Sequence, residues 1–243
     1  DNKSFYISAF NKKNKCKPFL RWAGGKKWLI KDLKRFLPEN FNNYHEPFLG
    51  GGAIFFHLKP NNKSFLNDYN EELIDTYRAI KNDVEGVIRE LKLFKNTEEC
   101  YYNIRSKKYK KEIKKAARFI FLNQTSFNGI YRVNLKGEYN VPFGYRKKDF
   151  LEPDNLRLAN EILKTTELSS GDFTNAIVNI KKGDLVFLDP PYTITHNNNG
   201  FFKYNKKLFS EEDQYRLSTF IDNINKKGAY YILTNAAHDR VKE

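Results

Sequence analysis

The segment Asp189-Pro190-Pro191-Tyr192 holds the residue types in this chain that are best suited to chemistry. It follows the apolar run Asp184 to Leu188, which predicts a buried strand. An exocyclic amine on an aromatic ring is a weak nucleophile because its lone pair is delocalised, so an enzyme using it must accept hydrogen bonds from both N–H groups. The Asp189 carboxylate and the Pro190 carbonyl could accept them, the prolines would fix the turn, and the Tyr192 ring could stack on an extruded base. A proline-stiffened strand end without chemistry is the alternative.

A glycine turn, Phe48 to Gly52, lies between a predicted strand and a helix expected to begin at Ala53. Its glycines would let the backbone approach a bound molecule closely. A dinucleotide fingerprint is not supported, because Phe55 stands where the third glycine belongs. A P-loop is not supported at Gly24 to Lys26, because Lys27 follows in place of Ser or Thr. A simple tight turn remains the alternative.

Asp68 ends the next predicted strand, which begins at Lys63. A carboxylate at that position can accept hydrogen bonds from both hydroxyls of a ribose. Aspartate directly before a helix is also a favoured capping residue, and for Asp68 taken alone capping is the better interpretation.

These segments belong to an alternation of strands and helices that predicts an open, doubly wound α/β sheet. In such sheets ligands bind beyond the carboxyl ends of the strands. Ser210 and Asp213 form a capping-box pattern ahead of a helix with an apolar stripe. The other expected helices are about 71–93, 113–122 and 154–163, and the later expected strands are 166–168, 184–188 and 230–233.

The chain is strongly basic, with 43 Lys and Arg against 29 Asp and Glu in 243 residues. Residues 101–150 carry 13 of these basic residues and only three acidic ones. Alternating apolar residues between Tyr131 and Val141 predict a β-hairpin in this segment. Such a surface suits phosphate contact with stacking side chains, and a solvated basic face is the alternative. The interleaved aromatic residues are Tyr109, Phe127, Tyr131, Tyr139, Phe143 and Tyr145.

Several classes of protein are excluded by the same sequence. Residues 1–17 have no apolar core typical of a signal peptide, and no apolar run is long enough to cross a bilayer. We therefore expect a cytoplasmic location. Cys16 and Cys100 lie far apart, so neither a disulfide framework nor a metal site is expected.

Seven motifs in order closely resemble the Dam-type, D12-class DNA adenine-N6 methyltransferases, from Lys17 onward. They are FLRWAGGK (19–26), EPFLGGG (46–52), NDYN (67–70), FNGIYRVN (127–134), NVPFG (140–144), GDF (171–173) and DPPY (189–192). The resemblance implies a Rossmann-like, S-adenosylmethionine-dependent methyltransferase sheet with an inserted helical and β-hairpin DNA-recognition domain. It implies a catalytic domain at 17–95 and 151–243, a target-recognition insertion at 96–150 and an N-terminal extension at 1–16.

The resemblance also implies roles for particular residues. Asp189, Pro190, Pro191 and Tyr192 would be catalytic. Asp68 would hold the cofactor ribose, and Asp172 with Phe173 its adenine. The implied cofactor-binding set is Trp22, Ala23, Gly24, Lys26, Phe48, Gly50, Gly52, Asp68, Asp172, Phe173 and Asp189.

The implied partner is duplex DNA, with GATC as the expected site and a restriction endonuclease acting on that site as a further partner. Arg132 would make a bidentate contact with guanine, and Phe127 and Asn128 would lie near the vacated base pair. Many relatives read Gly-Arg-Tyr where this chain has Gly144-Tyr145-Arg146, so the chain departs from the family pattern at the expected phosphate contacts. The implied DNA-binding set is Phe127, Asn128, Ile130, Arg132, Asn134, Pro142, Tyr145 and Arg146.

The expected reaction is direct methyl transfer without a covalent enzyme intermediate. Enzymes acting on cytosine C5 need a cysteine beside proline, which neither Cys16 nor Cys100 provides. Cytosine-N4 enzymes typically have serine in place of Asp189, and glutamine-N5 protein methyltransferases have asparagine. A non-catalytic reader of DNA sequence with a methyltransferase-like fold is the alternative from a different class.

Overall fold

The computed structural model describes residues 15–22, 27–191 and 209–234, and its central feature is one sheet of five parallel strands in the order β3-β2-β1-β4-β5. The chain moves outward from β1 in one direction through β2 and β3, and then in the other through β4 and β5. This reversal between β1 and β4 is the switch point of a doubly wound sheet. The predicted doubly wound α/β sheet is confirmed. The strands are β1 (Tyr44–Glu46), β2 (Ser64–Asp68), β3 (Thr166–Ser170), β4 (Leu185–Leu188) and β5 (Tyr230–Leu233).

The helices begin where capping residues predict. The Asn70 side chain accepts a hydrogen bond from the backbone N–H of Leu73, and Ser210 forms the predicted capping box with Asp213. Two helices were not predicted, α1 and α4, because six and nine residues are too few to display a clear apolar period. The helices are α1 (Lys27–Asp32), α2 (Ala53–Leu58), α3 (Glu71–Leu91), α4 (Glu98–Ser106), α5 (Glu112–Thr125), α6 (Pro153–Leu163) and α7 (Glu211–Lys226). Short 3-10 helices are η2 (Leu33–Arg35), η3 (Phe127–Gly129) and η4 (Phe173–Val178).

Helices cover both faces of the sheet, and β4 shows this directly. Leu185 and Phe187 pack into the larger apolar core, whereas Val186 and Leu188 pack into a second core with α7 and η4. Successive side chains of a strand point to opposite faces, so a strand covered on both sides must be apolar throughout. All four β4 residues are buried, as the uninterrupted apolar run predicts.

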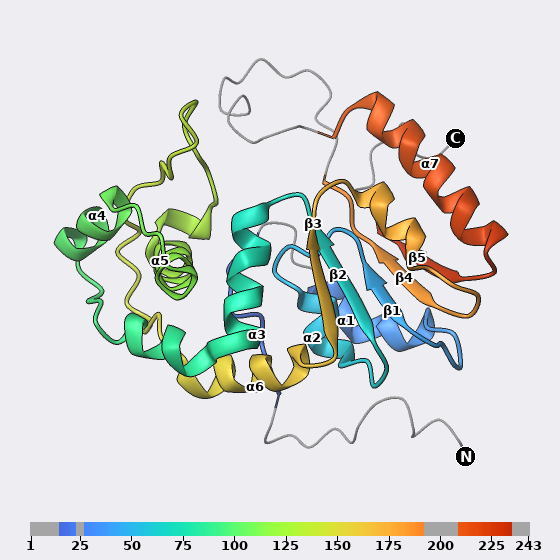
Figure 1. Cartoon of the computed structure of the whole chain (residues 1–243), viewed down its shortest axis with the longest axis horizontal. Helices are drawn as coiled ribbons and strands as arrows, with labels where there is room; N and C mark the ends of the chain where they lie inside the picture. Colours follow the sequence, from blue (N-terminus) through green and yellow to red (C-terminus); the bar gives the residue numbers. More distant parts are fainter. Residues whose placement is uncertain (1–14, 23–26, 192–208, 235–243) are drawn as a thin grey trace.

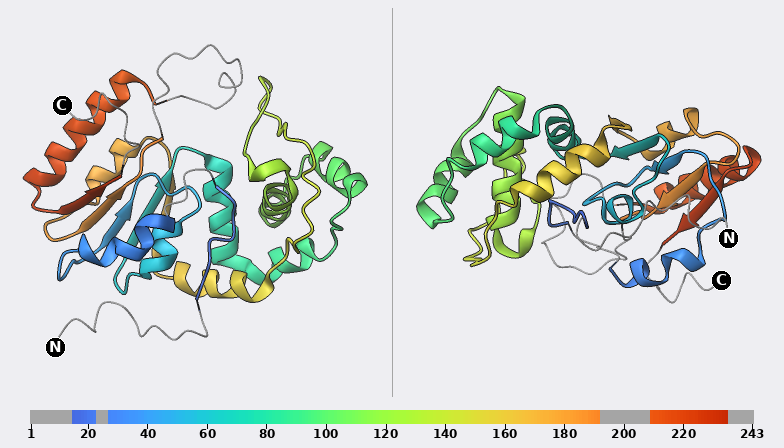
Figure 2. Two further views of the ribbon diagram at one scale, coloured as in Figure 1. Left: turned by 180° about the vertical axis from the view of Figure 1, so that it is seen from behind. Right: turned by 90° about the horizontal axis from the view of Figure 1, so that it is seen from below.

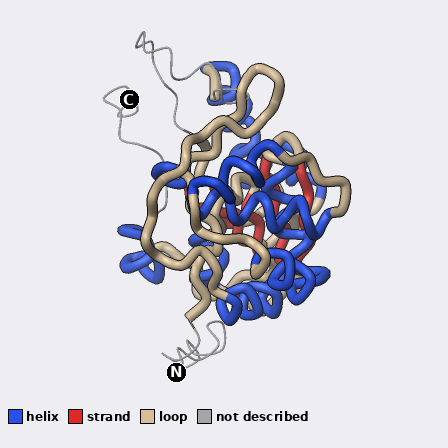
Figure 3. The backbone as a smooth tube through the Cα atoms, turned by 90° about the vertical axis from the view of Figure 1, so that its left-hand side faces the viewer, coloured by secondary structure: helices blue, strands red, loops and turns tan. Residues whose placement is uncertain are grey.

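Helix α3 stands between the sheet and the helices α4 and α5 (Figure 1, and from behind in Figure 2). It is broken at Asp83, whose φ and ψ of −150° and 71° are not helical. The Asp83 carboxylate accepts a hydrogen bond from the Gly86 N–H at 2.8 Å, so it caps the second half of the helix. Viewed from the α4 and α5 side, helices and loops lie in front of the strands (Figure 3).

The segment between α5 and α6 turns back on itself as predicted, but its pairing is looser than that of a regular hairpin. Its antiparallel contacts are two isolated bridges, Ser126 with Phe143 and Val133 with Tyr139. Pro142 lacks an N–H group and can only accept, from Phe127, so a continuous ladder cannot form there. The tip of this hairpin and the carboxyl ends of the strands face the same end of the molecule (Figure 1).

No helix in the described parts of the chain is long and apolar enough to cross a membrane.

Candidate active site and nucleic-acid interface

The glycine turn after β1 is held against the end of β2. The Gly50 N–H donates to the Asp68 carboxylate at 2.8 Å, and the Tyr77 hydroxyl donates to the Gly50 carbonyl at 3.1 Å. Gly50 and Gly52 have φ of +51° and +66°, and a Cβ on Gly50 would lie 2.7 Å from Cδ1 of Trp22. Both conformation and space therefore require glycine at position 50.

Asp68 uses both carboxylate oxygens to shape the site. One accepts from the Gly50 N–H and the other from the Asn70 N–H at 2.9 Å. The cap of α3 is Asn70, which accepts from Leu73 at 3.1 Å, so the capping interpretation of Asp68 is wrong. Burial raises the pKa of Asp68 and the backbone hydrogen bonds lower it, with burial the larger effect.

Asn67, which sequence reasoning did not single out, ties three strand ends together. Its side-chain N–H groups donate to the carbonyls of Pro47 and Gly171, each at 3.1 Å, and its carbonyl oxygen accepts from Ser169 at 3.0 Å. A buried asparagine that satisfies three partners fixes the spacing of the loops after β1, β2 and β3. Its place beside Asp68 in the NDYN motif was the available signal.

Asp172 caps the start of η4 and forms an ion pair with Arg216 of α7. Its Oδ1 accepts from the Thr174 N–H at 3.0 Å, the Thr174 hydroxyl at 2.6 Å and the Arg216 guanidinium at 2.6 Å. Burial raises the pKa of Asp172, but the bonds from Arg216 and Thr174 outweigh it and lower the pKa to about 2. Within the described residues its Oδ2 has no hydrogen-bond partner, so this oxygen can accept from a ligand.

An aromatic cluster lies beside this carboxylate. The Phe173 ring is 5.1 Å from Phe48 and 6.0 Å from Phe209, and the Arg216 guanidinium lies 5.2 Å from the Phe173 centroid. Phe48 and Phe173, both in the predicted cofactor-binding set, thus lie side by side. Arg216 was missed, because in the sequence it is an ordinary helical arginine three residues after Asp213.

Asp189 follows β4 directly and is held by the end of β5. The Thr234 hydroxyl donates to its Oδ1 at 2.8 Å, and the Thr234 N–H donates to the Leu188 carbonyl at 2.9 Å. Pro190 is buried and Pro191 is exposed. Four predicted site residues lie outside the described residues: Tyr192, Ala23, Gly24 and Lys26.

Glu46, at the end of β1, adds a third carboxylate to the same edge and was also missed. It is 3% exposed and accepts a hydrogen bond from the Tyr44 hydroxyl at 2.7 Å. Burial, with repulsion from Asp189 and Asp68, raises the pKa of Glu46 to about 8 despite the Tyr44 bond. Carboxyl groups gathered at neighbouring strand ends make this edge favourable for a cationic ligand, which would favour the ionised form of Glu46.

Trp22 connects this edge to the hairpin segment. It packs on the glycine turn, and its ring stacks 5.7 Å from Tyr131 and 6.4 Å from Phe119. The backbone of Arg21 exchanges two hydrogen bonds of 2.7 Å with the Asn123 side chain on α5. The segment that ends at Trp22 is therefore fixed on α5.

The hairpin presents apolar side chains to solvent. Phe127 is 51% exposed, Ile130 is 45% exposed and Tyr145 is 68% exposed. Exposed rings on a basic segment suit stacking on or between bases. Asn128 is also exposed and has a φ of +52°, and Pro142 is exposed.

Two polar members of the predicted DNA-binding set, Arg132 and Asn134, are engaged within the protein. Arg132 donates from Nε and Nη2 to the Asn140 carbonyl at 2.9 and 2.6 Å, which leaves Nη1 directed away from that contact. Asn134 accepts from the Lys136 and Glu138 N–H groups and so forms the hairpin turn.

Arg146 and Tyr145 contact neighbouring helices. Arg146 donates to the Gln124 side chain of α5 at 2.7 Å, and the Tyr145 hydroxyl donates to Glu98 of α4 at 2.7 Å. Tyr145 has a φ of +50°. Arg146 is therefore committed to α5, whereas Tyr145 keeps most of its ring exposed.

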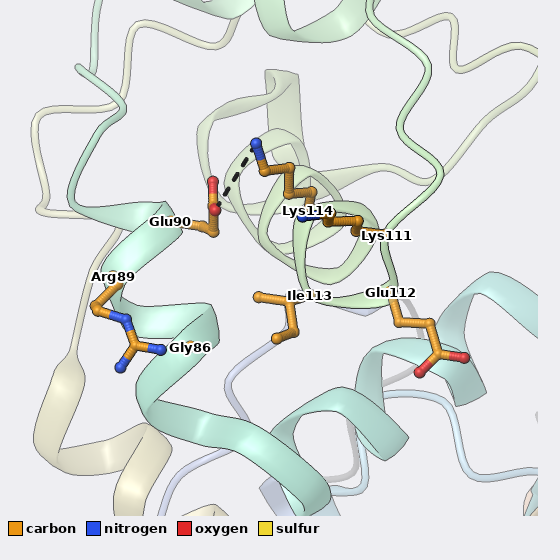
Figure 4. A pocket seen from close by; sticks show the side chains of 7 residues that line it. All are labelled: Gly86, Arg89, Glu90, Lys111, Glu112, Ile113 and Lys114. Atoms are coloured by element: carbon orange, nitrogen blue, oxygen red, sulfur yellow. Dashed lines mark ion pairs between the residues drawn. The ribbon is translucent and has the colours of Figure 1, made fainter.

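A hollow of about 430 Å³ lies away from these residues, between the last turns of α3 and the start of α5 (Figure 4). Its walls mix charges, with Lys114 and Glu90 4.0 Å apart. It is at the opposite end of α5 from Ser126 and contains none of the motif residues, so we assign it no part in the site.

A parallel sheet with this strand order and a glycine turn at its switch point is consistent with the Rossmann-like fold of methyltransferases. The chain belongs to the D12 class N6 adenine-specific DNA methyltransferases, whose family model matches residues 22–243. It is therefore an enzyme of DNA adenine methylation, and the family predicted from the motifs is confirmed.

Curated relatives agree with this assignment. The chain is similar to the Type II methyltransferase M.MjaIII of Methanocaldococcus jannaschii, with 37% identity over 90% of this chain and 84% of that protein. It is similar to the Type II methyltransferase M1.LlaDCHI of Lactococcus lactis subsp. cremoris, with 36% identity over 95% of this chain and 86% of that protein. The DNA adenine methylase of Escherichia coli is 30% identical over 94% of this chain and 82% of that protein.

Proposed function

We propose that this enzyme transfers a methyl group from S-adenosylmethionine to N6 of an adenine flipped out of a short duplex site. The observation that carries the proposal is Asp189, fixed by Thr234 at the end of β4 and beside the glycine turn at the switch point. A carboxylate held in this way can accept a hydrogen bond from an amine without having to reorganise.

The residues present fit the cofactor. Its cationic methionine part would suit the edge formed by Glu46, Asp68 and Asp189. Asp68 would accept hydrogen bonds from the ribose hydroxyls, and the Oδ2 of Asp172, which has no partner among the described residues, would accept one from the adenine amine beside Phe173. When bound, S-adenosylmethionine supplies an electrophilic methyl group on a sulfonium that is already a good leaving group.

The chain's own residues then have to orient the amine. Asp189 and the Pro190 carbonyl accept the two N6–H groups, which directs the N6 lone pair at the methyl carbon. The bound cofactor would supply the methyl group and retain the sulfur with its bonding pair, and the surplus N6 proton would pass to solvent. Positioning and electrostatics supply the catalysis, with no covalent enzyme intermediate.

We assign residues 17–95 and 151–243 to catalysis and 96–150 to target recognition. Support comes from the placement of α4 and α5 beyond α3 and from the exposed rings of Phe127, Ile130 and Tyr145 on the hairpin. Arg132 would turn its guanidinium from Asn140 to a guanine, where it makes a bidentate contact. Asn134 and Arg146 would support DNA binding indirectly. Asn134 forms the hairpin turn, and Arg146 is bonded to Gln124 of α5.

The target is an adenine-containing site, for which GATC is our proposal because the hairpin motifs resemble those of GATC-modifying relatives. Two of the relatives are named Type II methyltransferases. A restriction endonuclease that cuts the same site is accordingly the proposed functional partner.

The test is nucleoside mass analysis of unmethylated duplex DNA after incubation with enzyme and S-adenosylmethionine, followed by sequencing that maps the modified base. We expect N6-methyladenine from the unmodified chain and at least about a hundredfold less from Asp189→Ala, the scale for loss of one electrostatic contact. Asp189→Ala should still bind cofactor measurably.

Three results would contradict the proposal. Methylated cytosine would place the enzyme in a different class, and normal turnover by Asp189→Ala would remove the assigned catalyst. Tight DNA binding without any methylated product would favour a non-catalytic reader. DNA affinity should also fall steeply with salt, because each phosphate neutralised contributes about −0.9 to the slope of log K against log salt.

A further inference from the structure

A hydrogen bond joins the proposed DNA-contacting segment to the start of the helix that follows Asp68. The Tyr131 hydroxyl, on the hairpin, donates to the Glu72 carboxylate in the first turn of α3 at 2.7 Å, although the two residues are 59 positions apart. Glu72 follows Asp68 and Asn70, whose hydrogen bonds form the turn between β2 and α3. The bond therefore connects the hairpin to the turn that holds Asp68, the proposed ribose acceptor.

The Tyr131 ring makes a second connection to the same edge. It stacks on Trp22 at 5.7 Å, and Trp22 packs directly on Gly50 of the glycine turn. Phe119 of α5 lies 5.4 Å from Tyr131 and completes the aromatic contact. Tyr131 is thus held at its ring and at its hydroxyl by elements that belong to the cofactor edge.

Tyr131 lies next to a residue that is proposed to read the DNA sequence. The next residue is Arg132, the proposed guanine reader, and the carbonyl of Ile130 on the other side accepts from the Tyr139 hydroxyl at 2.9 Å. A ligand that fixes the Asp68 turn would also fix Glu72, and through it the backbone that presents Arg132. The hairpin would then lose less conformational entropy when DNA binds, so DNA affinity would rise.

We propose that Tyr131 and Glu72 are positioning residues that couple cofactor occupancy to DNA affinity, so that each ligand strengthens binding of the other. This inference rests on the proposed function for the identity of the two ligands. The coupling is a property of the link, and it is separable from catalysis at Asp189.

The chain offers a matched control. The Tyr145 hydroxyl donates to the Glu98 carboxylate at the same 2.7 Å distance, but Glu98 belongs to α4 and has no contact with the strand ends in the described structure. Glu72 and Glu98 are both exposed glutamates in the first turn of a helix. Substituting one or the other therefore compares a bond that reaches the cofactor edge with one that does not.

The experiment measures the affinity for a fluorescent 20-base-pair duplex carrying the mapped site, without and with saturating S-adenosylhomocysteine. The ratio of the two dissociation constants is the coupling factor. For the unmodified chain we expect at least about fivefold, the lower end of typical allosteric coupling. Tyr131→Phe and Glu72→Ala should each reduce it to below about twofold, with cofactor affinity in the absence of DNA nearly unchanged.

Three further variants test whether the coupling depends on this bond. Glu72→Gln keeps an oxygen that can accept from Tyr131, so it should recover part of the coupling, and Glu98→Ala should keep the full factor. The double variant Tyr131→Phe with Glu72→Ala should lose no more coupling than Tyr131→Phe alone, because Tyr131→Phe already removes the bond to Glu72.

Unchanged coupling in Tyr131→Phe and Glu72→Ala would overturn the inference, as would an equal loss in Glu98→Ala or a factor of one in the unmodified chain. Thermal unfolding of each variant shows whether the fold is kept, and Tyr131→Phe keeps the stacked ring. A chain that makes no N6-methyladenine and binds no S-adenosylhomocysteine contradicts the proposed function. One that does both without coupling contradicts only this inference.

Discussion

The strand-end edge and the hairpin segment are built in opposite ways. At the edge, polar groups from distant parts of the chain are bonded to one another: Asp68 to Gly50, Asp189 to Thr234, and Asp172 to Arg216. The hairpin holds most of its hydrogen bonds within about ten residues and exposes Phe127, Ile130 and Tyr145.

The difference follows from what each region has to do. Transfer between two bound molecules requires acceptors fixed in place before the ligands arrive, because reorganisation would add to the barrier. Reading a duplex requires side chains that are free to leave solvent and enter a groove or a base stack. Substitutions at the edge should therefore change cofactor affinity and turnover, whereas substitutions on the hairpin should change DNA affinity and site preference.

The largest effect is expected from Asp68→Ala. It removes the proposed ribose acceptor and leaves the half-buried N–H groups of Gly50 and Asn70 without their partner, at a cost for each below the about 1–3 kcal/mol of a fully buried donor. We expect cofactor affinity to fall by more than about a hundredfold. Calorimetric titration with S-adenosylhomocysteine measures this.

Asp68→Asn is the milder comparison, because it keeps one oxygen for one of the two N–H groups. DNA affinity measured without cofactor should change little in either variant. If DNA affinity fell as far as cofactor affinity in a folded variant, the division between the two regions would be wrong.

Arg132→Ala is the corresponding test of the hairpin. Loss of a bidentate guanine contact should cost about 1–3 kcal/mol, or roughly 5- to 150-fold in affinity for the cognate site, and should relax preference at one base. Arg132→Lys keeps the charge but loses the fork, so it should keep non-specific affinity and lose discrimination. Binding to cognate and single-substitution duplexes measures both, and an equal loss on every sequence would reassign Arg132 to phosphate contact.

The third prediction concerns the buried carboxyl of Glu46. Its pKa is raised from the ordinary 4.5 to about 8, so the folded chain keeps a proton that the unfolded chain loses. This residue therefore opposes folding increasingly as pH rises from about 4.5 to about 8. A bound cation favours the ionised form, so affinity for a cationic cofactor analogue such as sinefungin should rise through pH 8, by up to about tenfold.

Glu46→Gln cannot ionise, so its affinity for sinefungin should lack this contribution, and its stability should decline less between pH 5 and 8. Titration of both proteins from pH 6.5 to 9 separates the effect from ionisation of the ligand itself. Identical pH profiles for the two proteins would show that Glu46 does not sense the ligand charge.

The smallest effect is expected from Arg216→Ala. Asp172 would keep only its Thr174 contacts, its pKa would rise from about 2 toward its ordinary value, and cofactor affinity should fall by about three- to tenfold. Arg157 on α6 also bridges two carboxylates, Glu85 and Asp154, but lies outside the site. Arg157→Ala should leave S-adenosylhomocysteine binding unchanged. An equal loss of affinity in both variants would show that Arg216→Ala acts through a general loss of stability.

Much of the fold could be predicted because its signals are local. The apolar run of β4, the Ser210 capping box and the glycine turn each depend on neighbouring residues, and each is found where expected. The prediction for Asp68 as a cap was wrong because two positions, Asp68 and Asn70, carry capping side chains. Only their final backbone geometry distinguishes them.

The sequence alone determined the class of sheet, the order of the motifs and hence the family, because periodicity, turn chemistry and motif spacing are written along the chain. The tertiary structure decided which side chains meet across it: Thr234 with Asp189 at a separation of 45, Arg216 with Asp172 at 44, and Tyr131 with Glu72 at 59. Such pairs leave no local pattern. They form only when packing of the helices on the sheet brings distant segments within hydrogen-bonding distance, so the residues that tune the site became visible only in the folded molecule.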